Sequence, residues 1–349
     1  MKYPDNSNKL LTQRLRDLDK ITLNNINREL ISISKSKTNL DYGCYPEKRP
    51  IKEYIEMGVV NIDKSKGPSS HEVTAWIKNI LHIKKAGHSG SLDPKVTGLL
   101  PIMLGKATRL VAAIRLAHKE YVCLMRLHGN VSKKEVLRVC KEFTGQIFQT
   151  PPIKSAVKRQ VRIRTIYYID VIEVKSSFVL MRVGCEAGTY IRKLCHDIGL
   201  VLGCGGHMQE LRRTKVGPFN EGTLSSLHDL TDAYHFWKEN GDESHLRKII
   251  MPMEHGLSHI PKIIIRDSAV DAICSGAKLA VPGIVSVEEN INKDDLVCIM
   301  TQKNEAVSLS KALMSTNQII DATQGYSAIT ERVIMNANTY PRIWKTKQI

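Results

Sequence analysis

The sequence lacks any apolar run close to the roughly 20 residues that a membrane-spanning helix needs. Its first residues, MKYPDNSNKLLTQRLRDLDK, also lack the apolar core of a secretory signal peptide. Both absences argue against a membrane span and against secretion. We therefore expect no membrane partner and a cytosolic or nuclear compartment.

The eight cysteines include no C-x-x-C pair, which argues against a zinc ribbon. Cys195, His196, Cys204 and His207 lie close together in sequence, but their spacing fits no common zinc pattern. Cys195 also falls on the apolar face of a predicted helix. We interpret these four as core or loop residues and expect no metal site.

Negative charge is in short supply, since 35 acidic residues stand against 51 Lys and Arg, for a formal net charge of +16. A protein this basic usually binds a polyanion. Nucleic acid is the first candidate and an anionic membrane surface the second; the alternative is that the charge only aids solubility. With 349 residues, 42% of them hydrophobic, the chain is long enough for two domains with separate cores.

The pattern of elements indicates regular structure from about residue 51 onward. Residues 1–50 are polar and basic, with one short helix expected near 21–33. Ser69 and Glu72 form an S-x-x-E capping box, and the apolar spacing after them predicts a helix. Thr189 is the expected cap of another helix, over 190–202. Strands are expected over 58–63, 119–128 and 178–185, and a helix over 133–142.

A second unit begins near Pro261. Asp267 is expected to cap a helix that Gly276 ends. Short strands are expected over 295–301, 305–314, 317–323 and 328–335, a pattern typical of a small β-barrel. The predicted fold class is therefore α+β, with a catalytic domain followed by a small β-barrel domain and no internal repeat.

The segment GHSGSLDPKVTG is the first candidate site. Asp93 precedes a proline, which favours an extended backbone, and the surrounding glycines allow a tight turn and close approach of a ligand. A carboxylate on such a loop, beside His88 and Lys95, suits covalent or acid–base chemistry. The alternative is an ordinary Asp-Pro turn.

Two further motifs carry residues suited to a nucleic-acid substrate. Tyr121, at the start of a predicted strand, can stack on a base and move a proton, or it is a core aromatic residue. Arg192, two residues after Tyr190, can pair with a carboxylate or phosphate, or it is an ordinary surface arginine. Two basic stretches are candidates for phosphate contacts and otherwise are solvated faces; they contain Lys158, Arg159, Arg212 and Arg213.

Five stretches together closely resemble the TruB-type pseudouridine synthases: GHSGSLDPKVTGLLP, KEYV, SAVKRQVRIRT, CEAGTYIRKLCHDIGLVLG and GCGGHMQELRRTKVGPF. DSAVDAICSGAKLAVPGI and ERVIMNANTYPRIW resemble the PUA domain that follows in that family. The resemblance runs in unbroken order over about residues 50–345, so it is more specific than any single motif. Ser91 stands where threonine is more usual, a minor change.

The resemblance implies a fold, a reaction and roles for individual residues. The fold would be a central mixed, largely antiparallel sheet with flanking helices over 51–258, then a PUA domain over 259–345. The reaction would be isomerisation of uridine to pseudouridine in RNA, with no metal or organic cofactor. Asp93 would be the essential aspartate, Tyr121 would stack on the flipped uridine, and Arg192 would pair with the aspartate.

The same resemblance implies contacts to RNA outside the catalytic trio. His88 matches a loop histidine near the displaced nucleotide, and Gly276, Ala277 and Lys278 match the turn that touches RNA in PUA domains. We expect Lys95 and Tyr190 in the substrate site as well.

Within the family the match favours the dyskerin group, which works in box H/ACA ribonucleoproteins. Stand-alone bacterial enzymes carry an inserted RNA-gripping segment after the basic motif, and this chain has no room for one between Lys158 and Tyr168. The arm over 1–50 also resembles the guide-dependent branch, where it packs beside the PUA domain. The implied partners are a box H/ACA guide RNA, substrate rRNA and three small core proteins.

The resemblance also implies a location in the cell, and two alternative functions remain open. The group implies a role in rRNA processing in the nucleolus, although the Lys-rich tail usual in eukaryotic members is missing, so nuclear targeting would use the basic arm or a partner. One alternative is a stand-alone synthase for the tRNA TΨC loop. The other is an RNA-binding scaffold with a dead active site, against which the retention of Asp93, Tyr121 and Arg192 argues.

Overall fold

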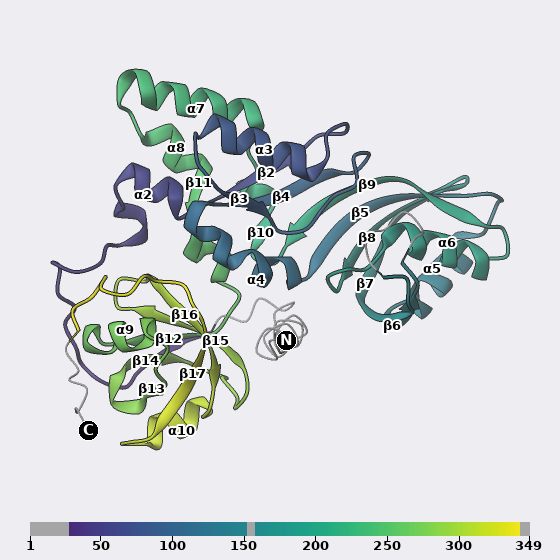
Figure 1. The fold of residues 1–349 in the computed structure, drawn as a ribbon. Coiled ribbons are helices and arrows are strands. Elements are labelled where there is room, and N and C mark those ends of the chain that lie inside the picture. Colours follow the sequence, from purple (N-terminus) through teal and green to yellow (C-terminus); the bar gives the residue numbers. More distant parts are fainter. Residues whose placement is uncertain (1–27, 152–157, 343–349) are drawn as a thin grey trace, which may run out of the picture. The chain divides into compact units, whose positions relative to one another are not determined.

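The computed structural model describes residues 28–151 and 158–342, which form two compact units (Figure 1). One unit comprises residues 59–251, and we name it the catalytic unit because the predicted site residues Asp93, Tyr121 and Arg192 lie in it. The terminal unit combines the chain before residue 59 with the chain from residue 252 onward. None of the helices in the described part of the chain is long and apolar enough to span a membrane.

A large mixed sheet forms the framework of the catalytic unit. Its strand order is β11-β2-β4-β9-β5-β8-β7-β6, with β3 added to β4 and β10 to β9. The β4–β9 pairing is parallel, and the β2–β4, β5–β8, β5–β9, β6–β7 and β7–β8 pairings are antiparallel. The strands are β2 (Gly58–Lys64), β3 (Ala86–His88), β4 (Thr97–Leu104), β5 (Lys119–Leu127), β6 (Gly145–Gln149), β7 (Arg162–Lys175), β8 (Phe178–Cys185), β9 (Gly206–Val216), β10 (Phe219–Asn220) and β11 (Ile250–Pro252).

Helices cover this sheet with their apolar faces. Val136, Val139 and Cys140 of one helix and Leu194 and Ile198 of another join a core cluster with strand residues. The elements are α3 (Ser70–Ile80), η2 (Gly105–Leu110), α4 (Val111–Leu116), α5 (Lys133–Glu142), α6 (Ile191–Val201), η3 (Glu221–Thr223), α7 (Leu227–Asn240) and α8 (Ser244–Ile249).

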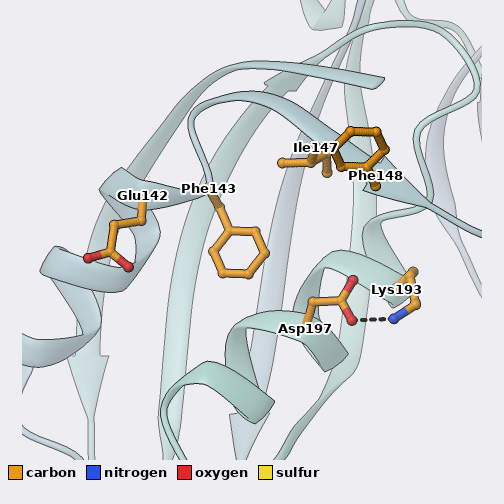
Figure 2. A pocket seen from close by; sticks show the side chains of 6 residues that line it. All are labelled: Glu142, Phe143, Ile147, Phe148, Lys193 and Asp197. Atoms are coloured by element: carbon orange, nitrogen blue, oxygen red, sulfur yellow. Dashed lines mark hydrogen bonds and ion pairs between the residues drawn. The ribbon is translucent and has the colours of Figure 1, made fainter. Parts of the chain in front are cut away.

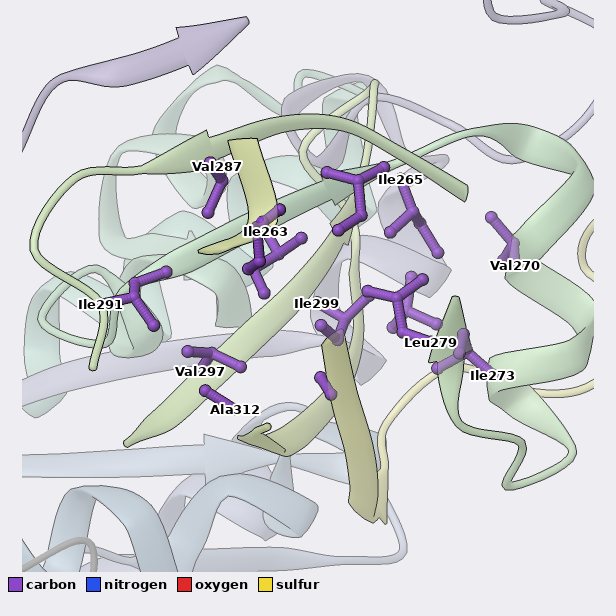
Figure 3. Close-up of a cluster of buried hydrophobic side chains, with 14 of the residues drawn as sticks. Ile263, Ile265, Val270, Ile273, Leu279, Val287, Ile291, Val297, Ile299 and Ala312 are labelled. Atoms are coloured by element: carbon purple, nitrogen blue, oxygen red, sulfur yellow. The ribbon is translucent and has the colours of Figure 1, made fainter. Parts of the chain in front are cut away.

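The terminal unit has its own seven-stranded sheet, of order β1-β14-β12-β15-β16-β17-β13. A cluster of buried aliphatic side chains fills its core (Figure 3). Pairings among the described residues do not close this sheet into the expected barrel. Its elements are β1 (Leu30–Ser32), η1 (Pro46–Lys48), α2 (Ile51–Glu56), η4 (Met253–Leu257), β12 (Lys262–Ile265), α9 (Asp267–Cys274), β13 (Leu279–Ala280), η5 (Val281–Gly283), β14 (Ile284–Glu288), β15 (Leu296–Thr301), β16 (Ala306–Ala312), α10 (Thr316–Asp321) and β17 (Tyr326–Val333).

The N-terminal segment is built into the terminal unit by strand pairing and by buried charge. Leu30–Ser32 pairs antiparallel with β14. Arg49 donates two hydrogen bonds to the Glu254 carboxylate, 2.7 and 3.0 Å long, and both side chains are buried. Glu254 also accepts from the Ala306 N–H at 3.2 Å. These long-range contacts fix the N-terminal segment within the same core as the C-terminal sheet.

Most predicted elements of the catalytic unit are confirmed, including the capping box of α3. The Glu72 N–H donates to Ser69 Oγ at 3.2 Å, and Glu72 accepts from the Ser69 N–H at 2.7 Å. The Thr189 cap is wrong, because Thr189 Oγ1 donates to the Glu186 carbonyl instead.

Three predictions for the terminal unit are wrong. Leu30–Ser32 is a strand, not part of a helix over 21–33, and residues 1–27 lie outside the described residues. Thr316–Asp321 is helical because Ser315 and Gln318 form a capping box. Asp267 does not cap α9, since its carboxylate accepts from Thr38 and Asn39.

Candidate active site

The loop that carries Asp93 joins β3 to β4 and is anchored on the start of α3. Ser70 Oγ accepts from the Leu92 N–H at 2.8 Å and donates to the Leu92 carbonyl at 3.3 Å. The Gly67 N–H donates to the Pro94 carbonyl at 3.0 Å. Backbone on both sides of Asp93 is therefore hydrogen-bonded to a neighbouring element, which fixes the direction of an exposed side chain.

Two buried cations hold the same loop from beneath. Lys64, 1% exposed, donates to the carbonyls of Pro94 (3.3 Å), Val96 (2.9 Å) and its neighbour Ser65. Arg213, also 1% exposed, donates to the carbonyls of Leu99 (2.8 Å) and Gly90 (3.3 Å). Burial lowers the pKa of both cations. Carbonyl dipoles take the place of carboxylate partners, so the loop itself satisfies these charges.

This arrangement corrects one expectation. Arg213 was expected to contact RNA phosphates, but its buried guanidinium cannot reach a ligand backbone. It lies next to Gly98, whose φ is +102° and where a Cβ would stand 2.2 Å from the Arg213 carbonyl oxygen. Only glycine allows β4 and β9 to approach this closely.

Arg192 forms an ion pair with Asp93, across 99 residues of chain. Both side chains are about half exposed, at 53% and 57%. Arg192 stands in the first turn of α6, and that helix start is fixed by Gln149: its amide accepts from the Tyr190 N–H (2.9 Å) and donates to the Tyr190 carbonyl (3.2 Å). The structure thus brings these two predicted residues together in an accessible position.

Tyr121, on β5, belongs to the same electrostatic group. Its hydroxyl shares a hydrogen bond with Arg213, and it also feels the charge of Asp93. Burial raises the pKa of the Tyr121 hydroxyl, and Arg213 offsets only part of that rise. The phenol therefore stays protonated at neutral pH, ready to donate a hydrogen bond rather than to act as a phenolate.

His88 lies at the other end of the loop, on β3. Its Nδ1 accepts from the Gly90 N–H at 3.3 Å, and its ring meets the His71 ring edge-on at 4.8 Å. Burial, followed by the nearby charges of His71, Arg213 and Arg115, lowers the pKa of His88 to about 4. This ring is neutral at physiological pH and cannot serve as a phosphate-binding cation.

Comparison with protein families accounts for this arrangement. Family models match in sequence order: the DKCLD (NUC011) domain over 20–74, the TruB family pseudouridylate synthase N-terminal domain over 78–191, the tRNA pseudouridylate synthase B C-terminal domain over 192–258 and the PUA domain over 261–334. A "Probable tRNA pseudouridine synthase B" from Methanosarcina barkeri is 64% identical over 92% of this chain and 95% of its own. The chain belongs to the TruB family of pseudouridine synthases.

Other relatives and solved structures agree with this assignment. The protein of the same name from Pyrococcus furiosus is 54% identical over 92% of this chain and 95% of its own. A chain from "Structure of H/ACA RNP bound to a substrate RNA containing 2'-deoxyuridine" matches with a TM-score of 0.85 at 52% identity, covering 91% of this chain and 98% of that one. A chain from "Crystal Structure of a Cbf5-Nop10-Gar1 Complex" gives 0.85 at 54% identity, covering 91% and 97%. The relatives are archaeal, so they give no support to a nucleolar location.

A buried polar group behind Tyr121 was missed by the sequence analysis of the synthase. The neighbouring Glu120 accepts from Tyr168 (2.5 Å) and Thr214 (2.7 Å). Burial alone would raise the Glu120 pKa, but these two hydrogen bonds and nearby cations lower it overall. Gly184 makes room for the Tyr168 ring, which a Cβ there would meet at 2.3 Å. No local motif identified this group, because its members come from three strands.

The remaining predicted cations of the synthase differ in availability. Lys95, Lys158 and Arg159 are exposed. Arg212 is not free for phosphates: it pairs bidentately with Asp63 (2.9 and 3.0 Å) and with Glu221 (2.7 Å), so we withdraw it as a phosphate contact. Among the described residues, no group of three or more His, Cys, Asp and Glu side chains is placed to hold a metal.

The predicted PUA turn of the synthase lies on the surface of the terminal unit. Gly276, Ala277 and Lys278 are all exposed, and Gly276 has a φ of +87°. Lys278 Nζ lies 5.5 Å from the centroid of the Tyr326 ring, which is 56% exposed. The sequence analysis missed Tyr326; its ring adds a flat surface on which a base can stack.

A hollow of about 390 Å³ opens between α5, β6 and α6 (Figure 2). Its lining is mainly apolar, with an ion pair between Lys193 and Asp197. None of Asp93, Tyr121 and Arg192 lines it, so this hollow is separate from the predicted catalytic residues.

Proposed function

We propose that this chain is the catalytic subunit of an RNA-guided pseudouridine synthase, which isomerises selected uridines in ribosomal and other structured RNA. The observation that carries the proposal is the Asp93–Arg192 ion pair beside a protonated Tyr121 in a TruB-family chain. An exposed carboxylate held on a rigid loop, with a guanidinium fixing its direction, suits attack on a nucleoside or assistance to a departing base.

The reaction we propose conserves all atoms of the nucleoside. The target uridine leaves its stack, which exposes the bond between C1′ and N1. That bond breaks with help from Asp93, the uracil turns within the site, and a bond forms from C1′ to C5. C5 then loses its proton and N1 gains one, so no oxidant, reductant or cofactor is consumed. Tyr121 stacks on the base, and its hydroxyl is placed to handle a proton.

Dependence on a guide RNA is supported by two observations. The segment after the basic motif leaves no room for the RNA-gripping insertion of stand-alone bacterial enzymes. The structural neighbours, which align over most of this chain, come from an H/ACA RNP bound to a substrate RNA, from a Cbf5-Nop10-Gar1 complex and from an archaeal box H/ACA sRNP Nop10-Cbf5 complex. We propose that the present chain assembles with a box H/ACA guide RNA and with small proteins of the same kinds.

Direct action on tRNA is the second candidate. It is favoured by the names of the curated relatives, each a "Probable tRNA pseudouridine synthase B". In that case the chain would modify a tRNA stem-loop without any guide.

One assay tests both. The full chain is assembled with a box H/ACA guide and homologues of Nop10 and Gar1, and pseudouridine is measured in a matched target RNA and in a tRNA stem-loop. We expect guide-dependent modification of the matched target, and none when the guide is scrambled. Equal modification of the tRNA with and without guide would favour the second candidate. Inactivity on both substrates would contradict the proposal that the chain is catalytic.

A further inference from the structure

The region around Asp93 is markedly depleted of acidic residues. Between Glu72 and Glu120 the only acidic residue is Asp93 itself, whereas eight residues are Lys or Arg: Lys78, Lys84, Lys85, Lys95, Lys106, Arg109, Arg115 and Lys119. Lys119 is buried and donates to backbone carbonyls. The other seven are exposed. Asp93 lies near the middle of this positively charged stretch. An effect on solubility alone does not explain such an excess of cations around the proposed catalytic carboxylate.

Four of these cations lie on adjoining segments. Ala86 pairs with Leu104 at the start of β3, and the Gly105 N–H donates to the Lys85 carbonyl at 2.7 Å. Lys84 and Lys85 therefore neighbour the start of η2, which carries Lys106. The cationic surface, as we name it, consists of Lys84, Lys85, Lys106 and Arg115.

Arg115 links this surface to the Asp93 loop. A Cβ built on Gly90 would lie 3.9 Å from Arg115 Cγ, so the Arg115 stem packs against the loop. The charge of Arg115 is also felt at His88. Helix α4 and η2 in turn pack on β3, since a Cβ on Gly87 would lie 3.1 Å from Val111 Cγ2. The surface thus runs along one β3–η2–α4 assembly and ends at the catalytic loop.

No described carboxylate pairs with any of these four cations. By contrast, the partly exposed Arg212 pairs with Asp63 and Glu221, and the exposed Arg138 pairs with Glu135 and Glu142. Unpaired, clustered cations next to a site for a polyanionic substrate produce a local positive potential that attracts phosphates. From Lys85 to His88 the extended chain covers about 10 Å, room for roughly three nucleotides of a stacked strand.

We propose that Lys84, Lys85, Lys106 and Arg115 bind the phosphodiester backbone of the RNA strand that carries the target uridine, on one side of that uridine. The inference rests on the proposed function, because it takes Asp93 as the point at which the target base arrives. Neutral His88 lies where the phosphate contacts end and the displaced nucleotide begins. The surface contacts phosphates alone, so it adds affinity without sequence preference.

The test is a charge-neutralising triple variant with a matched control. Lys84→Gln/Lys85→Gln/Lys106→Gln is compared with Lys133→Gln/Lys134→Gln/Lys141→Gln, which removes three exposed lysines from α5. Binding of the full chain to a single-stranded oligouridylate is measured over a salt series. We expect the first variant to bind about tenfold more weakly at physiological salt, with a salt slope smaller by about 2, and the control to behave as wild type.

Turnover gives a second readout in the guided particle. The triple variant and Arg115→Gln should raise KM for the target RNA and leave kcat unchanged, because none of the four touches the reacting atoms. The proposal would be overturned by an unchanged salt slope or by an equal loss of binding in the α5 control. It would also be overturned if, with binding to anionic vesicles measured alongside, the triple variant lost only its affinity for the vesicles. The oligouridylate assay needs no turnover, so it still decides this inference if the guided activity itself fails.

Discussion

At the scale of single residues, the site combines one exposed ion pair with two buried cations. Asp93 and Arg192 are open to a substrate, whereas Lys64 and Arg213 lie beneath the loop and donate to its backbone carbonyls. A carboxylate held in this way loses little freedom when a substrate arrives, which is what precise attack on one nucleoside atom requires.

Asp93→Asn should abolish pseudouridine formation and leave RNA binding nearly intact. The amide keeps the shape of the side chain but is neither a nucleophile nor a base, so turnover should fall by roughly 10² to 10⁴-fold. Single-turnover assays with a guided target would measure it. Asp232→Asn, an exposed change on α7, is the control. Turnover above a few per cent of the wild-type rate would contradict the assignment.

Arg192→Ala should slow turnover at least about tenfold, a barrier increase of about 1.4 kcal/mol, and Arg192→Lys should restore it only in part. A planar guanidinium offers two directed donors where an ammonium offers a point charge. Arg138→Lys is a matched control, because Arg138 is also 53% exposed and also pairs with acids. Identical rates for Arg192→Lys and wild type would rule out a geometric role for the guanidinium.

His88 should make the synthase less stable in mild acid. Its pKa is about 4 in the folded chain against an ordinary 6.5, so the unfolded chain binds the extra proton first as pH falls. The stability is fully present above pH 6.5 and is lost as pH falls toward 4. Urea unfolding across that range should show a smaller decline for His88→Gln than for wild type, whereas His196→Gln, an exposed change, should decline as wild type does.

At the scale of elements, the sequence predicted correctly those helices and strands that depend on residues within a single segment. The Ser69–Glu72 box, the apolar spacing after it and the strand pattern over 119–128 each act within one segment, and each prediction is confirmed. Asp267 failed as a cap because Thr38 and Asn39, more than 200 residues away, donate to its carboxylate.

The same limit applies to the candidate site, where features that depend on contacts distant in sequence could not be predicted from local motifs. The pairing of Asp93 with Arg192 joins segments 99 residues apart, and only the resemblance to a family indicated it. Burial of Arg213 depends on how β4 and β9 meet, so an LRRT segment could not reveal it. Gln149, Glu120 and Tyr326 were missed because each acts through neighbours that are distant in sequence.

The turn after α9, which the family resemblance predicts to contact RNA, should be sensitive to the shape of its backbone. Gly276→Val forces a side chain into a φ of +87°, which costs about 1–2 kcal/mol, although no atom lies within 4 Å of a Cβ there. We expect Gly276→Val to reduce the preference of the full chain for guide RNAs that end in ACA over guides that end in a scrambled trinucleotide, as measured by their binding affinities. Gly241→Val is the control, with a φ of +73°, the same open space and a place after α7. Equal loss of preference in both variants would indicate general destabilisation.

At the scale of the whole molecule, the terminal unit depends on the buried Arg49–Glu254 pair, which joins the two separate stretches of chain that form this unit. Arg49→Met should cost about 3–5 kcal/mol, because it leaves the buried Glu254 carboxylate without its partner. Arg49→Met/Glu254→Met should recover only part of this, since the Ala306 N–H then loses its acceptor. Urea unfolding would measure both. A double variant less stable than Arg49→Met would show that the carboxylate is satisfied without arginine.

Pairing of Leu30–Ser32 with β14 has a consequence during synthesis on the ribosome. The first strand of the terminal sheet emerges more than 200 residues before its partner, so it must wait unpaired while the whole catalytic unit is translated. The catalytic unit is then an insertion within a split domain and can fold first, while the split domain closes last. A chain whose synthesis stops early would release a folded catalytic unit together with an unpaired Leu30–Ser32 strand. The exposed edge of that strand would be a target for chaperones and for aggregation.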